Sequence, residues 1–145
     1  MRAISLWAIL QRTVSDGYTD LVTRRTGVAV RGGIEEELAG TEGEPTFIDF
    51  GDVRCLDYSC ADEIVAKLVL QHGGWRFFLR GLTPSQKDAI GPVLERHNLA
   101  VVSVADGTGR VEFIGPDTEA ARLLGELRDH GLVSESDGGY RTQLA

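Results

Sequence analysis

The stretch TFIDFGDVRCLDYSCADEIVAKL, residues 46–68, decides the expected fold of this chain. Its first part, from Phe47 to Phe50, is aromatic and β-branched around one aspartate, and a Gly-Asp pair follows. Such a short run ended by turn residues is typical of a central strand. From Ala61 onward, apolar residues recur three and four positions apart, which indicates an amphipathic helix. The stretch therefore predicts a strand, a turn and a helix.

The predicted helix has a hydroxyl residue at its start. Ser59 precedes the apolar stripe and Asp62 follows three residues later, which is a capping-box pattern. We therefore expect Ser59 to be the N-cap, at a helix end whose N–H groups and dipole favour negative charge. A phosphate would be tolerated at this end, so Ser59 has two interpretations, a structural cap or a phospho-acceptor.

These residues resemble the strand–turn–helix of STAS domains, the fold of the bacterial anti-sigma-factor antagonists. Residues 48–50, Ile-Asp-Phe, are similar to the apolar strand of that family, and residues 56–60, Leu-Asp-Tyr-Ser-Cys, are similar to its helix start. Ser59 matches the serine that partner kinases phosphorylate in the family. Tyr58 replaces the first serine of the family pattern, and Cys60 replaces its glycine.

A second element of the resemblance precedes the strand. Arg24, Gly27 and Arg31 have the Arg-x-x-Gly-x-x-x-Arg spacing of a divergent STAS-like branch, and the resemblance covers residues 20–105. It implies an α/β fold, in which helices pack against a mixed sheet, and a bacterial regulator that acts in signal transduction. The implied partner is a histidine-kinase-like ATPase serine kinase or an anti-sigma factor. That partner would bind the ATP, so we expect no cofactor in this chain.

The turn and the helix start also predict a protein-binding face at residues 57–63. Phosphorylation of Ser59 would add negative charge there and release a partner that binds through an acidic or apolar patch. Arg24 and Arg31 are seven residues apart and share a helix face, which is either solvated, paired with an acidic group near the strand ends, or in contact with the partner. The candidate partner-binding residues are Asp57, Tyr58, Cys60, Asp62, Glu63, Arg24 and Arg31.

Strands and helices are expected to alternate along the rest of the chain. This alternation is typical of βαβ units in a largely parallel or mixed sheet. Residues 1–115 are predicted to form the STAS-like domain, and residues 116–145 a C-terminal helix and β-hairpin docked on it. Strands are expected within 1–25 and at 47–50, 75–79, 99–104 and 111–114, and helices at 24–39, at 60–71, after a capping box at Thr83, and from Pro116.

Composition and charge limit the classes of function. The chain has 145 residues, 42% hydrophobic and 26% charged, which is typical of one soluble globular domain. No apolar run approaches the roughly 18 residues of a membrane span, and the N-terminus has no signal-peptide cleavage pattern, so a cytoplasmic location is expected. The net charge is −7 and no third of the chain is basic, which argues against a nucleic-acid partner and is compatible with a protein partner.

The remaining reactive residues do not form a recognisable site in the sequence. Cys55 and Cys60 are five residues apart, which is not a zinc-ligand spacing, and two buried thiols are expected. His72, His97 and His130 each fall near a predicted helix end, where a cationic or hydrogen-bonding side chain is favoured. We therefore expect no catalytic residue, no metal ligand and no enzymatic activity.

Two alternative functions remain open at this point. The first is a DNA-associated transcriptional regulator that uses the C-terminal hairpin as the wing of a winged-helix-like module, although this wing would carry only Arg141 as a cation. The second is a small enzyme whose site assembles from scattered residues. A deep pocket lined by two or more titratable groups would favour the enzyme.

Overall fold

The computed structural model describes residues 2–41 and 43–143 of the chain. Within these ranges, one sheet has five strands in the order β1-β2-β3-β4-β5, and four of them are parallel, while β5 runs antiparallel to β4. The mixed α/β class predicted from the alternation of strands and helices is thus confirmed. The strands are β1 (Arg2–Ser5), β2 (Thr46–Asp49), β3 (Phe77–Arg80), β4 (Val101–Val104) and β5 (Val111–Ile114).

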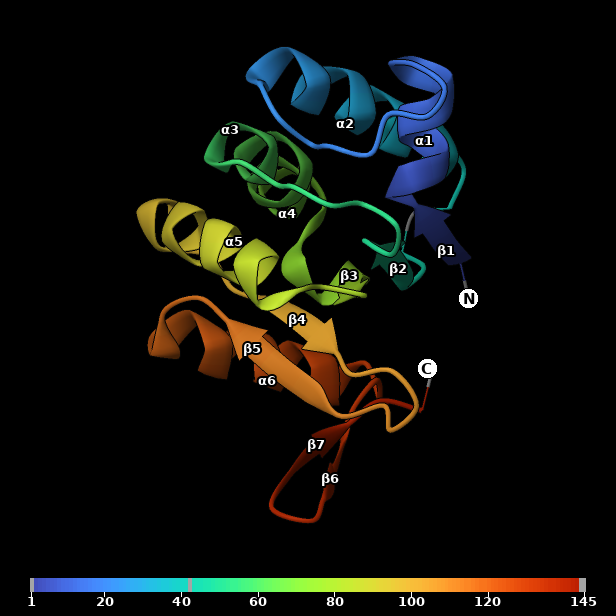
Figure 1. Cartoon of the computed structure of the whole chain (residues 1–145). Helices are drawn as coiled ribbons and strands as arrows, with labels where there is room; N and C mark the ends of the chain where they lie inside the picture. Colours follow the sequence, from blue (N-terminus) through green and yellow to red (C-terminus); the bar gives the residue numbers. More distant parts are fainter. Residues whose placement is uncertain (1, 42, 144–145) are drawn as a thin grey trace.

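The helices lie on both faces of this sheet (Figure 1). One continuous helical run, which we call helix 58–72, changes its winding twice and consists of α3 (Tyr58–Ala61), the π-helix η1 (Asp62–Ala66) and α4 (Lys67–His72). The other helices are α1 (Leu6–Thr13), α2 (Arg24–Leu38), the short 3₁₀ helix η2 (Gly74–Arg76), α5 (Pro84–His97) and α6 (Asp117–Asp129). No helix in the described ranges is long and apolar enough to cross a membrane.

Alternating residues of the strands divide the core into two clusters. Ile48 and Leu79 lie in a large cluster with residues of α1, α2, helix 58–72 and α5. Their neighbours Phe47 and Phe78 lie in a smaller cluster with Leu123 and other residues of α6. Because successive side chains of a strand point to opposite faces, the two clusters cover the two faces of one sheet. Burial on both faces explains why these strands are nearly uninterrupted apolar runs.

The beginning of the chain differs from its prediction. Residues 1–25 were expected to be strands, but β1 is followed at once by α1. Ser5 ends the strand and caps the helix, because its hydroxyl accepts a hydrogen bond from the Ala8 N–H at 3.1 Å. Leu6 and Leu10 are buried on one helix face together with Ile9. The run after Ser5 is so rich in apolar residues that it matches the spacing of a strand as well as that of a helix. Its sequence therefore does not decide between the two structures, and the packing of its side chains does.

Two predicted helix starts are confirmed. Helix α2 spans 24–38, where a helix over 24–39 was expected, and the capping box at Thr83 begins α5. A helix, α6, and the hairpin of β6 (Ser134–Ser136) with β7 (Gly139–Arg141) are present at the C-terminal end.

Alanine substitutions at the two adjacent glycines of α2 are expected to change the stability of the protein in opposite directions. A Cβ at Gly33 would lie 2.6 Å from Cγ2 of Ile9 in α1, whereas a Cβ at Gly32 would meet nothing within 4 Å. Gly32→Ala should therefore raise the free energy of unfolding by about 0.5–1 kcal/mol through helix propensity. Gly33→Ala should lower it by roughly 1–3 kcal/mol, because α1 must move away from α2. Urea denaturation of both variants tests this, and equal shifts would contradict the close packing of α1 on α2.

Candidate functional site

The predicted protein-binding segment begins with an aspartate that caps helix 58–72. Oδ1 of Asp57 accepts the N–H of Cys60 at 2.8 Å, and Oδ2 accepts the N–H of Thr23 at 2.7 Å. The expectation that Ser59 is the N-cap is therefore wrong, since the helix begins two residues earlier and Ser59 lies within its first turn. The cap also joins two segments, because Thr23 is itself the N-cap of α2.

Tyr58 is the exposed residue of this segment. Its relative exposure is 58%, the largest among the exposed large hydrophobic residues of the described chain. It borders an open pocket of about 320 Å³ between the start of α3 and the first turns of α5. We call this the Tyr58 pocket, and it is lined by Leu56, Asp57, Tyr58, Ser85, Asp88 and Ala89.

Asp62 and Glu63 instead face the interior, where cationic side chains surround them. Arg24 Nη1 lies 2.8 Å from Oδ2 of Asp62 and 2.5 Å from Oε2 of Glu63. Arg31 Nε lies 3.2 Å from Oε1 of Glu63, and Lys67 Nζ also contacts this carboxylate. The ring of His97 completes the group at 2.7 Å from Oδ1 of Asp62. We call these six residues, Arg24, Arg31, Asp62, Glu63, Lys67 and His97, the ion cluster.

The ion cluster changes the interpretation of several candidate residues. The relative exposure of Glu63 is 1% and that of Asp62 is 8%, so their carboxylates pair with partly exposed cations and do not themselves form an open surface. Cys60 is also fully buried. Arg24 and Arg31 do share a helix face, and they pair with acidic groups as one interpretation expected. These acids lie on helix 58–72 instead of at the strand ends.

Two backbone features bring the cluster together. A Cβ at Gly27 would lie 3.0 Å from Cβ of Glu63 and 3.1 Å from Cα of Cys60, so glycine allows α2 to approach closely. The π-helix begins at Asp62, which contacts both α2 through Arg24 and α5 through His97, while Glu63 contacts α2 through Arg24 and Arg31. The Arg-x-x-Gly-x-x-x-Arg spacing is the sequence signal that could have located this contact.

The pairing lowers the pKa of both acids. Burial raises the pKa of the Asp62 carboxyl, but hydrogen bonds from Arg24 and His97 outweigh burial, and the pKa is lower than usual. Burial likewise raises the pKa of Glu63, and hydrogen bonds from Lys67, Arg24 and Arg31 lower it further than burial raises it. Both carboxylates are therefore held in the charged form, which suits an ion pair and not a general acid at neutral pH.

The cysteines do not form a reactive pair. Cys60 is buried, its Sγ lies 3.1 Å from the carbonyl oxygen of Thr23, and burial raises its pKa to about 12. Such a thiol is protonated at neutral pH and is a poor nucleophile. Cys55 is exposed, so the expectation of two buried thiols is wrong for this residue.

The histidines occupy helix ends, as predicted. His72 is the last residue of α4 and lies 3.0 Å from Oε2 of Glu35 in α2. His130 follows α6 and stacks on Trp75 with ring centroids 3.8 Å apart. Within residues 2–41 and 43–143, no group of three or more His, Cys, Asp or Glu side chains could hold a metal ion.

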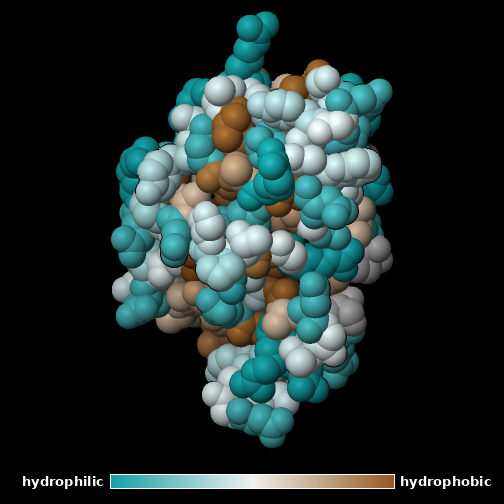
Figure 2. Space-filling model, viewed as in Figure 1, coloured by the Kyte–Doolittle hydropathy of each residue, from teal (hydrophilic) through white to brown (hydrophobic). Residues whose placement is uncertain are grey.

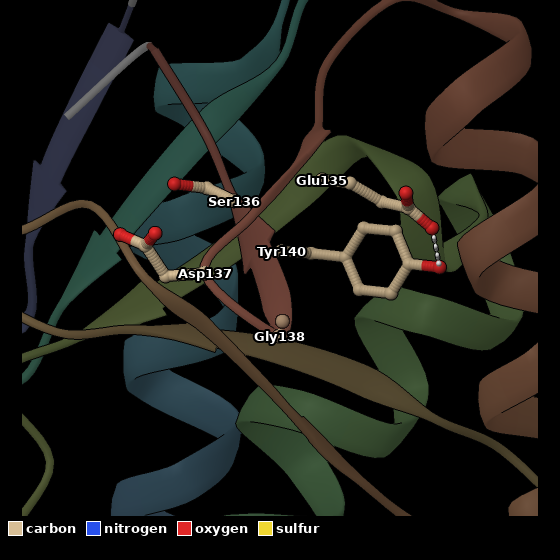
Figure 3. A pocket seen from close by; sticks show the side chains of 6 residues that line it. Glu135, Ser136, Asp137, Gly138 and Tyr140 are labelled. Carbon is tan, nitrogen blue, oxygen red and sulfur yellow. Dashed lines mark hydrogen bonds between the residues drawn. The ribbon is translucent and has the colours of Figure 1, made fainter.

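A larger open pocket, of about 400 Å³, lies at the C-terminal hairpin. Figure 3 shows that Glu135 and Tyr140 point to one side of the hairpin, while Ser136 and Asp137 point to the other. The Tyr140 hydroxyl and Oε1 of Glu135 are 3.4 Å apart. The hairpin thus presents acidic side chains, Glu135 of β6 and Asp137 of the turn, where a DNA-binding wing needs cations.

Comparison of the chain with protein-family models, with curated proteins and with solved structures found no match.

The cap assignment makes a direct prediction. Asp57→Ala should lower the free energy of unfolding by about 1–2 kcal/mol, because the N–H groups of Cys60 and Thr23 both lose an acceptor. The matched variant Ser59→Ala should change it by less than about 0.5 kcal/mol. Thermal and urea denaturation measure both values. A larger loss for Ser59→Ala than for Asp57→Ala would restore Ser59 as the cap.

The ion cluster predicts a loss of stability in acid. The pKa values of Asp62 and Glu63 are lower in the folded protein than in the unfolded chain, where they lie near 4. The cluster therefore contributes fully above the unfolded-state pKa values and is lost as the pH falls through the folded-state values. Glu63→Gln should reduce this pH dependence. It should also lower the free energy of unfolding at pH 7 by about 3 kcal/mol. This value is at the low end for removing one partner of a buried ion pair, because the cations that remain are partly hydrated.

Glu36→Gln is the matched control for this experiment. Glu36 has a side-chain exposure of 78% and lies 3.5 Å from Arg12, so its removal should cost less than about 0.5 kcal/mol at any pH. Urea denaturation at several pH values between 3 and 7 gives the two profiles. Identical profiles of unfolding free energy against pH for the two variants would show that Glu63 contributes no more to stability than the exposed Glu36.

Proposed function

We propose that this chain is a non-enzymatic regulatory module that binds a protein partner at the Tyr58 pocket. The observation that supports this most directly is the exposure of Tyr58, a large aromatic side chain with 58% of its surface open to solvent. Tyrosine is enriched in the energetically dominant centres of protein interfaces, since it buries a large apolar area and keeps a polar hydroxyl.

The position of the pocket in the fold supports the same function. Helix 58–72 follows β2 along the chain and α5 follows β3, and these two strands are parallel neighbours. Both helix starts therefore come after the carboxyl ends of adjacent strands, which is where open α/β sheets bind their ligands. A partner at this edge would contact Tyr58 together with Ser85 and Asp88 of α5.

The chemistry of the pocket favours binding over catalysis. It is open rather than deep, and both carboxylate oxygens of Asp57 accept backbone N–H groups. A general base needs a carboxylate oxygen that can reach a substrate proton, so Asp57 is poorly suited to that role. The polar side chains that remain, the hydroxyls of Tyr58 and Ser85 and the carboxylate of Asp88, are suited to the polar rim of an interface.

Ser59 is the proposed control point of this binding. It lies in the first turn of the helix, next to Tyr58, and is partly exposed. A phosphate on Ser59 would add negative charge next to the pocket, which would repel an acidic partner surface and would be costly to desolvate against an apolar one. The resemblance to anti-sigma-factor antagonists makes an ATPase-type serine kinase or an anti-sigma factor the proposed partner.

A photo-crosslinking residue at position 58 tests the proposed function. In cells that make the full chain, position 58 should give one discrete adduct with another protein, and position 108 in the exposed turn between β4 and β5 should not. Tyr58→Ala should then raise the Kd for the captured partner by about 30-fold, as expected for an interface hot spot. Thr108→Ala should leave the Kd unchanged.

The role of Ser59 is tested with the same partner. Ser59→Asp should weaken binding and Ser59→Ala should not, and mass spectrometry should find phosphate on Ser59 when the partner is a kinase. Unchanged binding for both variants removes the switch but leaves the pocket. The absence of any adduct at position 58 would reject the binding function itself.

A further inference from the structure

The opposite side of helix 58–72, which faces α2, has a second exposed surface. We call it the basic–apolar patch, and it consists of Arg24, Val28, Arg31, Lys67 and Leu70. Val28 and Leu70 are 46% and 57% exposed, and the cationic side chains are between 28% and 50% exposed. Figure 2 shows hydrophobic atoms at the surface among hydrophilic ones in the region of α2 and α3.

Helical spacing brings these residues together. Arg24, Val28 and Arg31 follow one another at intervals of four and three in α2, so they lie in one row. Both arginines contact Glu63, which shows that this row faces helix 58–72. Lys67 also contacts Glu63, and Leu70 follows it by three residues in α4. The two rows therefore lie on either side of the same contact between the helices, with an apolar residue in each.

The cations retain hydrogen-bonding capacity beyond the ion cluster. The ion pairs use Nη1 of Arg24 and Nε of Arg31. A guanidinium has five N–H donors and an ammonium has three, so each of these side chains has donors left for an acceptor that approaches from solvent. Glu63 holds the three cations in place from below, which reduces the entropy that binding would otherwise cost.

The charge of the patch is opposite to that of the molecule. The side chains of Arg24, Arg31 and Lys67 are 28–50% exposed, whereas those of Asp62 and Glu63 are 11% and 1% exposed, so the patch shows cations to solvent on a chain that carries −7. Glu35, the next residue of this row in α2, pairs with His72. A ligand that binds here needs acceptors for the remaining donors and apolar atoms for Val28 and Leu70. An acidic segment that also carries apolar side chains satisfies both requirements.

We propose that the basic–apolar patch binds an acidic, amphipathic segment of a partner protein. Carboxylates of that segment meet Arg24, Arg31 and Lys67, while its apolar side chains cover Val28 and Leu70. The proposal rests on the proposed function in that the chain is a protein-binding module. It adds the chemistry of the partner and uses a surface separate from the Tyr58 pocket, so the two can fail independently.

A synthetic peptide tests this proposal with the full chain. The probe is a fluorescein-labelled 14-residue peptide of Glu, Leu and Ala in which Glu and Leu each recur every three or four residues. Fluorescence anisotropy at 50 mM salt should give a Kd between about 1 and 100 μM, and binding should weaken as salt rises. A peptide with Lys in place of Glu should not bind, and one with Gln in place of Leu should bind at least about tenfold more weakly.

Val28→Asp and Leu70→Asp are the decisive variants. Both residues are exposed and neither belongs to the ion cluster, so circular dichroism and thermal denaturation should show an intact fold. Each variant should weaken binding of the Glu/Leu peptide at least about tenfold, since a carboxylate placed on the patch repels the probe and removes apolar contact. Val14→Asp, at an exposed residue after α1, is the matched control and should bind as the unmodified chain does.

Several outcomes would overturn the proposal. These are no binding of the Glu/Leu peptide at 50 mM salt, equal binding of the Lys-containing peptide, and unchanged binding by Val28→Asp and Leu70→Asp. Binding to phosphatidylglycerol vesicles without binding to the peptide would overturn it in favour of a lipid surface. None of these results affects crosslinking at position 58, so the proposed function is judged separately.

Discussion

Glu63 carries its negative charge in the interior of the protein, and the packing of the surrounding helices depends on neutralising it. Removing a carboxylate from water costs several kcal/mol unless cations and hydrogen bonds replace the solvent. Arg24 and Arg31 provide them from α2 and Lys67 from the next turn of the same helix. Gly27 allows the close approach that these contacts need. The position of α2 against helix 58–72 is therefore set by charge as well as by apolar contact.

The same constraint explains how one helix can present two different surfaces. Because the carboxylates of Asp62 and Glu63 are buried against their cation partners, the exposed chemistry of this region comes from other residues. Tyr58 is exposed on the side of α5, and Val28 and Leu70 are exposed on the side of α2. The ion cluster lies between these surfaces and joins α2, helix 58–72 and α5. Partner binding on either side would thus act on elements that are already held together, which limits the entropic cost of association.

Much of the fold could be predicted because its signals are local. The capping box at Thr83, the helix from Arg24 and the strand at 46–49 each follow from neighbouring residues. The prediction failed where two local patterns competed. The apolar run after Ser5 fits both periods, and packing on α2 decided for the helix. Asp57 and Ser59 are both good N-caps, and the second contact of Asp57, with Thr23 on a distant segment, is a tertiary interaction.

For the candidate site, the sequence by itself determined which side chains were available. It placed Arg24 and Arg31 on one helix face, and it placed Tyr58 and the acidic pair at the start of another helix. Only the tertiary structure decided which of them are buried. Spacing along one helix does not show what packs against it, so the burial of Glu63 and the exposure of Tyr58 could not be derived from it. That difference follows from how α2 and α5 pack on the two sides of helix 58–72.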